Sequence, residues 1–262
     1  MAKVYLVGAG PGAADLLTMR ATRVIESADV ILYDALVSDE ILEFAKPTAQ
    51  LIDVGKRGGR KFFNKTLQQE EINALLVQFA LQVELVVRLK GGDPLVFGRA
   101  AEEMDALRNA GIDFEIVPGV TAACSAAAAA KISLTDRRVA SQVLLTTAHH
   151  SEENLGRVSR VDSASDTTIV IYMPGRDYSL VQERLRGTGI GDETPCLVVS
   201  RISSHDQKVF ATTVRKLGEA PMLPAPSLVI VGEVARRELS REETSFHEIT
   251  NPTTPFAIAW YS

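Results

Sequence analysis

The sequence predicts an α/β protein built from two α/β domains. In the first half of the chain, short apolar runs alternate with segments of helical periodicity, which is typical of a parallel sheet flanked by helices. Most of these runs end in a turn rich in Gly or Pro. After an alanine-rich segment at about 120–130, strand-like runs follow one another with a single strong helix among them. We therefore expect domains at 1–120 and 121–240, followed by a tail at 241–262.

The apolar runs and periodic segments define the elements of the first domain. Strands are expected at 3–7, 29–33, 51–54, 83–89 and 114–117. Helices are expected at about 16–28, 67–81 and 102–107, the last of them ending at Gly111, because glycine is favoured just past a helix C-terminus. The run at 83–89 is apolar except for Glu84 and Arg88, which is typical of a central parallel strand, since both of its faces are buried.

The second domain is expected to contain more strands and fewer helices than the first. Strands are predicted at 139–147, 167–173, 195–200, 208–213 and 227–231, and a helix at 178–187. The polar stretch from His149 to Asp166 is interpreted as a surface loop.

The composition is that of a globular protein with an apolar core. Of 262 residues, 46% are hydrophobic and 23% charged, and 28 Lys and Arg against 33 Asp and Glu give a net charge of −5. This acidic balance disfavours a nucleic-acid partner, and no apolar run approaches the roughly 18 residues that a membrane span requires. The cysteines and histidines lack the spacing of disulfide frameworks or metal sites. Because the N-terminus shows no leader pattern, we expect a cytoplasmic protein.

The segment from Gly8 to Ala13 follows a strand and opens a helix, with the Gly-x-Gly-x-x-Ala spacing of a dinucleotide fingerprint. Pro11, however, removes a backbone N–H that would face a pyrophosphate. Asp34 also comes later than the roughly 20 residues usual for a ribose contact. A plain strand-to-helix turn is the favoured interpretation of this motif taken alone.

The segment from Arg88 to Pro94 is more informative, because two glycines and a carboxylate leave a buried strand together. They do so at the sheet edge where open α/β sheets bind ligands. Gly91 and Gly92 allow a ligand to approach the main chain, and Asp93 offers acceptors for an amine or hydroxyl group. The segment 118–122 repeats this pattern at the next strand end. The alanine run that follows is either a buried helix or a surface for close approach by a ligand or another subunit.

Five segments in this order and spacing resemble the tetrapyrrole methylases: GAGPGAADLLT, YDALVS, VGKRGG, RLKGGDPLVFGRAAEE and VPGVTAACSAA. The resemblance covers about residues 3 to 237. YDALVS and VGKRGG point within this family to the branch that methylates uroporphyrinogen III. Other precorrin methylases and the ribosomal-RNA ribose methylases of the same fold are expected to differ at these two motifs.

The resemblance implies two α/β domains with a cleft between them that holds the cofactor S-adenosylmethionine, in a homodimer that needs no metal. The residues that match the cofactor site of the family are Pro11, Gly91, Gly92, Asp93, Val96, Thr121, Ala122 and Met173. Without the resemblance, core packing would be the favoured interpretation of Met173. In the second domain, 146–149 and 201–203 depart from the common family sequences.

The implied reaction is methylation of uroporphyrinogen III at C2 and then C7, through precorrin-1 to precorrin-2, on the route to sirohaem and cobalamin. Asp34 matches the family's proton acceptor, and Lys56 matches its proton donor. From the residues alone, Asp34 would be a turn cap and Lys56 a solvated surface charge. The many carboxylates of the substrate call for cations, and the candidates are Arg57, Arg60, Arg88 and Arg99.

Three alternatives remain for the function. Another precorrin methylase would share the cofactor site and modify a different ring carbon. An RNA ribose methylase would need a basic surface, which the sequence pI near 5.5 disfavours. A nucleotide-binding regulator built on Gly8 to Ala13 would bind NAD and not S-adenosylhomocysteine.

Overall fold

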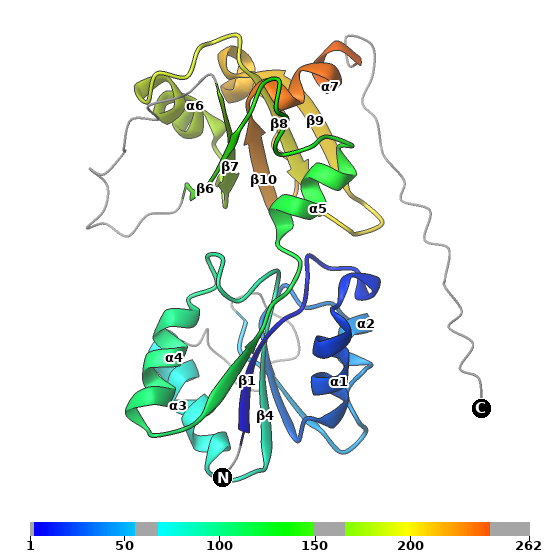
Figure 1. The fold of residues 1–262 in the computed structure, drawn as a ribbon, viewed down its shortest axis with the longest axis vertical. Coiled ribbons are helices and arrows are strands. Elements are labelled where there is room, and N and C mark those ends of the chain that lie inside the picture. Colours follow the sequence, from blue (N-terminus) through cyan, green and yellow to red (C-terminus); the bar gives the residue numbers. More distant parts are fainter. Residues whose placement is uncertain (1–2, 56–67, 149–165, 242–262) are drawn as a thin grey trace, which may run out of the picture. The chain divides into compact units, whose positions relative to one another are not determined.

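The computed structural model describes residues 3–55, 68–148 and 166–241 (Figure 1). The chain divides into two compact units, Met1–Ser125 and Ala126–Ser262. The division falls within helix α5 (Ala122–Ala129), near the boundary that the sequence predicts at 120. The expected surface loop and tail lie almost entirely outside the described residues. Each unit combines one sheet with helices, which confirms the predicted α/β class.

The first unit contains a five-stranded sheet in which all neighbouring strands are parallel. Its order is β3-β2-β4-β1-β5, and its strands are β1 (Lys3–Gly8), β2 (Val30–Tyr33), β3 (Gln50–Asp53), β4 (Leu85–Lys90) and β5 (Phe114–Val117). β4 is the central strand, as its mostly apolar sequence predicts. The carboxyl ends of all these strands therefore lie at one edge of the sheet.

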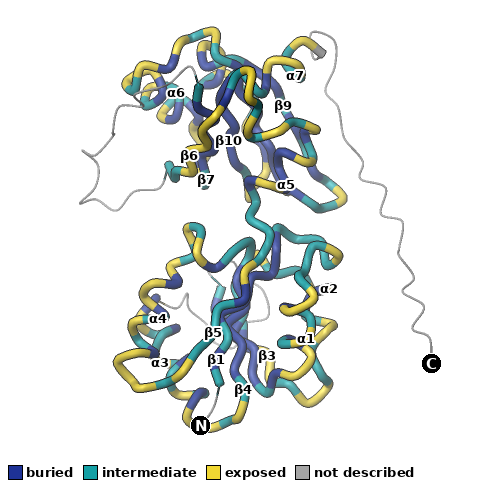
Figure 2. Tube along the Cα trace, in the orientation of Figure 1, coloured by how far each residue is buried: buried dark blue, intermediate teal, exposed yellow. Residues whose placement is uncertain are grey.

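Helices cover both faces of this sheet, and the inner strands β1, β2 and β4 between them are mostly buried (Figures 1 and 2). The helices are α1 (Met19–Ser27), α2 (Asp39–Leu42), α3 (Gln69–Ala80) and α4 (Ala100–Asn109). Because side chains alternate along a strand, Val4 and Leu6 of β1 pack with α3 and α4. Val7 of the same strand packs with α1 and α2.

Local hydrogen bonds set the helix limits. The Thr18 side chain accepts the N–H of Ala21, so α1 begins one residue after Thr18. Leu16, which the helical spacing placed in the same helix, is instead the last residue of a separate 3-10 turn, Ala14–Leu16. At the other end of the unit, α4 stops before Gly111, which has a φ of +67° and donates its N–H to a carbonyl of the last turn. The predicted helix end is confirmed there.

The second unit contains a mixed sheet with the order β6-β7-β10-β8-β9. Its strands are β6 (Gln142–Thr147), β7 (Thr167–Tyr172), β8 (Pro195–Ser200), β9 (Lys208–Thr213) and β10 (Ser227–Val231). β6 and β7 are parallel, and the other neighbours are antiparallel. The prediction of more strands than in the first unit is wrong, since within the described ranges each sheet has five. The difference lies in strand direction, since the first sheet is parallel throughout and the second is mostly antiparallel.

Helices α6 (Tyr178–Gly187) and α7 (Arg236–Arg241) belong to this unit. Tyr178, Val181 and Leu185 of α6 pack on the sheet in one apolar cluster. No helix in the part of the chain that the structure describes is long and apolar enough to cross a lipid bilayer.

Tyr178→Phe is expected to leave stability unchanged or to raise it by up to about 1 kcal/mol. The Tyr178 side chain is 3% exposed, and its hydroxyl has no hydrogen-bond partner among the described residues. Removing an unpaired buried hydroxyl relieves a desolvation cost of roughly 1–3 kcal/mol, whereas Tyr178→Ala should lose about 3–5 kcal/mol of packing. Urea denaturation of the two variants measures both effects. A clear loss of stability in Tyr178→Phe would show that the hydroxyl is hydrogen-bonded.

Candidate active site

Turns after β1 and β4 meet at the carboxyl edge of the parallel sheet. The N–H of Gly92 donates to the Gly10 carbonyl at 2.6 Å, and the N–H of Gly10 donates to the Gly92 carbonyl at 3.2 Å. The Ala9 N–H also donates to the Lys90 carbonyl, at 2.8 Å. These bonds form a short bridge beyond the end of the sheet. The turn that resembles a dinucleotide fingerprint is thus part of the same structure as the Gly91–Asp93 turn.

The turn after β5 joins this structure through close backbone contact at Gly119. A Cβ atom on Gly119 would overlap the Gly92 carbonyl oxygen and lie 2.8 Å from the Gly8 Cα. Gly92 differs, because its φ is +71° and an added Cβ would meet no heavy atom of the described residues within 4 Å. Gly119 is therefore required for packing between turns, and Gly92 leaves one side of its turn open.

Asp93 connects the turns after β4 and β5. Its Oδ1 accepts the N–H of Leu95 at 2.8 Å, and its Oδ2 accepts the N–H of Gly119 at 3.0 Å. Since a carboxylate oxygen accepts two hydrogen bonds, each oxygen retains a lone pair for a ligand donor. The structure therefore assigns Asp93 an organising role in addition to the acceptor role expected from the sequence.

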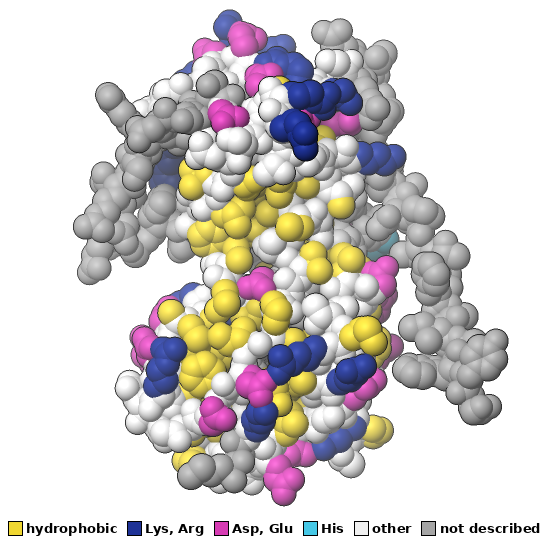
Figure 3. Space-filling model, in the orientation of Figure 1, with side chains coloured by type: hydrophobic (Ala, Val, Ile, Leu, Met, Phe, Trp, Pro, Cys, Tyr) yellow, Lys and Arg dark blue, Asp and Glu magenta, His cyan; other side chains and the backbone are white. Residues whose placement is uncertain are grey.

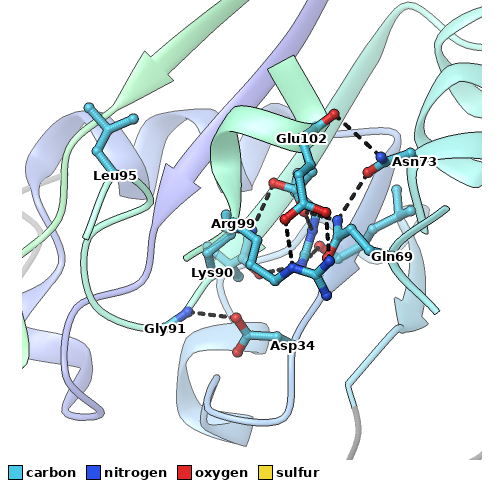
Figure 4. A network of polar contacts seen from close by, with 12 residues as sticks. Asp34, Gln69, Asn73, Lys90, Gly91, Leu95, Arg99 and Glu102 are labelled. Carbon is cyan, nitrogen blue, oxygen red and sulfur yellow. Dashed lines mark hydrogen bonds and ion pairs between the residues drawn. The ribbon is translucent and has the colours of Figure 1, made fainter. Parts of the chain in front are cut away.

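Asp34 follows β2 and, like Asp93, accepts hydrogen bonds from two backbone N–H groups. Its Oδ1 accepts the N–H of Leu36 at 2.9 Å, and its Oδ2 accepts the N–H of Gly91 at 3.0 Å (Figure 4). The turn-cap interpretation of Asp34 is therefore correct as a description of its contacts. The half-buried carboxylate nevertheless lies at the same sheet edge as Asp93.

A buried charged cluster lies behind these turns, formed by Arg88 and Lys90 of β4 and Glu103 of α4. Arg88 Nε donates to Glu103 Oε1 at 2.8 Å, and Lys90 Nζ donates to Glu103 Oε2 at 2.7 Å. Gln69 of α3 donates to the same carboxylate at 3.4 Å. Burial and Arg88 lower the pKa of Lys90 to about 8, against the opposing effects of Glu103 and Asp34. Burial raises the pKa of Glu103, but the two cations outweigh it and hold that pKa below its usual value.

The position of Arg88 disagrees with its expected role as a substrate-binding cation. The residue is 4% exposed, and its guanidinium also donates to the Leu32 and Leu89 carbonyls at 3.3 and 3.0 Å. We therefore leave Arg88 out of the proposed substrate site. Lys90 and Glu103 were not among the site residues expected from the sequence. A feature of the sequence that could have indicated Lys90 is the spacing of two charged residues in an apolar strand, which places Arg88 and Lys90 on the same face of β4.

The remaining candidates of the first unit follow the same strand ends. Pro11 lies in the turn after β1, Val96 in the turn after β4, and Thr121 and Ala122 at the start of α5. Arg99 precedes α4 with a φ of +55°, and its exposed guanidinium pairs with Glu102 at 2.6 Å. Lys56, Arg57 and Arg60 lie outside the described residues.

Met173 belongs to the second unit and directly follows β7. Its side chain is 47% exposed, so core packing does not explain it. Its φ of +49° is rare for a residue with a side chain, and such strained conformations cluster at functional sites. Both observations favour a ligand contact over a structural role.

Glycine-rich turns and carboxylates at the carboxyl edge of a parallel sheet define a ligand-binding α/β protein. The family model for tetrapyrrole (corrin/porphyrin) methylases matches residues 3–218, and the chain belongs to this family.

Known relatives are similar over most of the chain. The uroporphyrinogen-III C-methyltransferase of Bacillus subtilis is 43% identical over 238 residues, which are 89% of this chain and 91% of that protein. The siroheme synthase of Actinobacillus succinogenes is 45% identical over 232 residues, or 88% of this chain and 48% of that protein. The chain thus spans about half the length of this longer relative. A Thermus thermophilus uroporphyrin-III C-methyltransferase, solved with S-adenosylhomocysteine, has a TM-score of 0.74 and 36% identity, covering 90% of this chain and 99% of that one.

Proposed function

We propose that the chain is an S-adenosylmethionine-dependent methyltransferase that acts on uroporphyrinogen III. It would add methyl groups at C2 and C7, with precorrin-1 as the intermediate and precorrin-2 as the product. The observation that supports this most is similarity to the Bacillus enzyme along nearly the whole of both chains, with Asp34 and the Gly91–Asp93 turn at one sheet edge.

The turns of the first unit fit the methionine end of the cofactor. Asp93 retains lone pairs that can accept from an ammonium group, and Gly92 leaves the adjacent side of the turn open. The residues proposed to hold the cofactor are Pro11, Gly91, Gly92, Asp93, Val96, Thr121, Ala122 and, from the second unit, Met173. When bound, the cofactor supplies an electrophilic sulfonium methyl group for attack by a pyrrole carbon.

The role of the protein in the reaction is to orient the substrate and to move protons. Attack through a ring carbon leaves the pyrrole nitrogen with a proton to lose. We assign Asp34 as the acceptor of this proton, because hydrogen bonds from two backbone N–H groups hold its carboxylate in a fixed orientation. Lys56, by its family position, is the proposed proton donor.

Substrate carboxylates are proposed to bind Arg57, Arg60 and Arg99. Arg99 is available for this, because an exposed ion pair such as Arg99–Glu102 is weak and exchanges partners readily.

Arg57→Ala and Arg60→Ala are each expected to weaken uroporphyrinogen binding about tenfold or more, since a charge-assisted hydrogen bond contributes roughly 1.5–3 kcal/mol. The affinity for S-adenosylhomocysteine should change by less than about twofold. Equilibrium binding of the two ligands tests this. Arg108→Ala, which removes an exposed arginine paired with Asp105, is the matched control. Equal losses for both ligands would argue against the assignment.

A homodimer in the cytoplasm is also proposed. Apolar side chains gather on the face of the second unit that Figure 3 shows. On the edge strand β6 of this unit, Val143, Leu144 and Leu145 are at least 36% exposed. Exposed apolar patches of this kind favour association. Cys124 and Cys196 are free thiols, which suits a reducing compartment.

The decisive experiment is mass spectrometry of the tetrapyrrole after anaerobic incubation with uroporphyrinogen III and S-adenosylmethionine. The proposal expects the addition of two methyl groups. If none is added and S-adenosylhomocysteine still binds, the substrate is a later precorrin or RNA. If S-adenosylhomocysteine does not bind, the cofactor assignment is wrong as well.

A further inference from the structure

The turn after β2, residues 34–38, is fixed by contacts with the turns after β1 and β3. The Ser38 hydroxyl donates to the Gly12 carbonyl, in the turn after β1, at 2.9 Å. A Cβ atom on Gly55, in the turn after β3, would lie only 2.7 Å from the Ala35 Cβ. No side chain fits at that distance, so the Gly55 main chain packs directly against Ala35. These contacts hold the turn after β2 in one conformation.

The turn after β4 adds a third contact, in which Leu36 lies against Gly91. The N–H of Leu36 donates to Asp34 Oδ1 at 2.9 Å, and the N–H of Gly91 donates to Asp34 Oδ2 at 3.0 Å (Figure 4). A Cβ atom on Gly91 would lie 2.6 Å from Leu36 Cβ, 3.3 Å from Leu36 Cδ1 and 3.5 Å from Asp34 Oδ1. The leucine side chain therefore occupies space that only a glycine at position 91 leaves free, on the same side of Gly91 as the carboxylate.

Leu36 is nevertheless 47% exposed, whereas the other residues of its turn are half-buried. The stabilisation from an apolar side chain grows with the apolar area removed from water, so about half of what a leucine can contribute is not realised here. Single exposed leucines are ordinary on protein surfaces. This one differs, because its backbone and its side chain are both fixed beside a carboxylate at the carboxyl edge of the sheet.

We propose that Leu36 is a substrate-contact residue, whose exposed side chain packs against the pyrrole ring that is being methylated and directs the N–H of that ring to Asp34. This inference rests on the proposed function, in which Asp34 accepts the pyrrole proton. The pyrrole rings are the flat, apolar parts of uroporphyrinogen III, and its side chains end in carboxylates. A fixed apolar contact next to the proton acceptor therefore recognises a ring, and the arginines recognise the margins of the same molecule.

Leu36→Ala is expected to weaken the binding of uroporphyrinogen III about tenfold when S-adenosylhomocysteine, which has no methyl group to transfer, is also present. The rate of methyl transfer should fall about tenfold as well, because the ring loses its fixed orientation toward Asp34. The affinity for S-adenosylhomocysteine alone should stay within about twofold of wild type, since Leu36 is not assigned to the cofactor. Anaerobic equilibrium binding and single-turnover kinetics measure these three quantities.

Two further variants separate apolar contact from the filling of space. Leu36→Met keeps a flexible apolar side chain of similar volume and should retain at least about one-third of the wild-type affinity and rate. Leu36→Asn is similar in size but polar, so it should lose about as much as Leu36→Ala. Leu81→Ala is the matched control, because Leu81 is 75% exposed and follows α3 at the opposite edge of the sheet, and all three quantities should stay within about twofold of wild type.

Wild-type affinity for uroporphyrinogen III in Leu36→Ala or Leu36→Asn would overturn the inference. Equal losses of affinity for uroporphyrinogen III and S-adenosylhomocysteine would also overturn it, because Leu36 would then only support the turns. Failure of the proposed function is a separate result, since the wild-type protein itself would then neither bind nor methylate uroporphyrinogen III.

Discussion

Asp34→Asn is expected to lower kcat for methyl transfer by about 100- to 10,000-fold, the range for loss of a general base. The amide has a similar shape, but it does not accept the pyrrole proton. Because its nitrogen donates, the side chain can accept from only one of the Leu36 and Gly91 N–H groups, which should cost about 1 kcal/mol of stability. The affinity for S-adenosylhomocysteine should stay within about twofold of wild type.

Single-turnover kinetics and calorimetric binding of S-adenosylhomocysteine separate these two effects. Asp29→Asn is the matched control, because Asp29 precedes β2 and its Oδ2 accepts the N–H of Leu85 at 3.0 Å. It makes the same kind of bond at the opposite edge of the sheet. Full turnover in Asp34→Asn would remove Asp34 from the chemistry and leave it as a turn cap.

Gly119→Ala is expected to destabilise the first unit by roughly 1–3 kcal/mol or more and to weaken S-adenosylhomocysteine binding at least about tenfold. The atoms that the new methyl group would meet belong to the backbone of Gly8 and Gly92, so no side-chain rotation relieves the overlap. Displacing Gly92 also disturbs Asp93, which accepts the Gly119 N–H. Denaturation and equilibrium binding measure the two losses.

The control for this prediction is Gly187→Ala at the end of α6. An added Cβ there meets no described heavy atom within 4 Å, and its effect should be neutral or stabilising by up to about 1 kcal/mol. If Gly119→Ala behaved like Gly187→Ala, the turns would be much more adaptable than their contacts indicate.

Local sequence patterns predict most of the fold. The mostly apolar sequence of β4 marks the centre of the sheet, and Gly111 marks the end of α4. Helix α2 was not predicted, because its four residues are too few to show a helical period. The start of α1 was placed too early, because apolar spacing continues through the 3-10 turn before Thr18.

For the site, the sequence predicts which turns take part but not which residues their side chains contact. In a parallel sheet, the Gly91–Asp93 turn and the segment after β5 lie at the same carboxyl edge. The periodicity of apolar residues is sufficient to predict this sheet. Asp34 and Asp93 each have one distant partner, Gly91 at 57 residues and Gly119 at 26 residues along the sequence. Arg88 was likewise expected in the substrate site. It pairs instead with the Glu103 carboxylate of α4, and only the folded chain brings these two residues together. Such pairings depend on strand register and helix packing, which local patterns do not specify.

The bridge between Gly10 and Gly92, together with the bond from Gly119 to Asp93, has a consequence for protein engineering. The three turns are separate in sequence but interlock through their main chains. Grafting one of them from a relative would place it against two partners that evolved with a different shape. A successful exchange of specificity should therefore transplant the turns after β1, β4 and β5 as a single cassette.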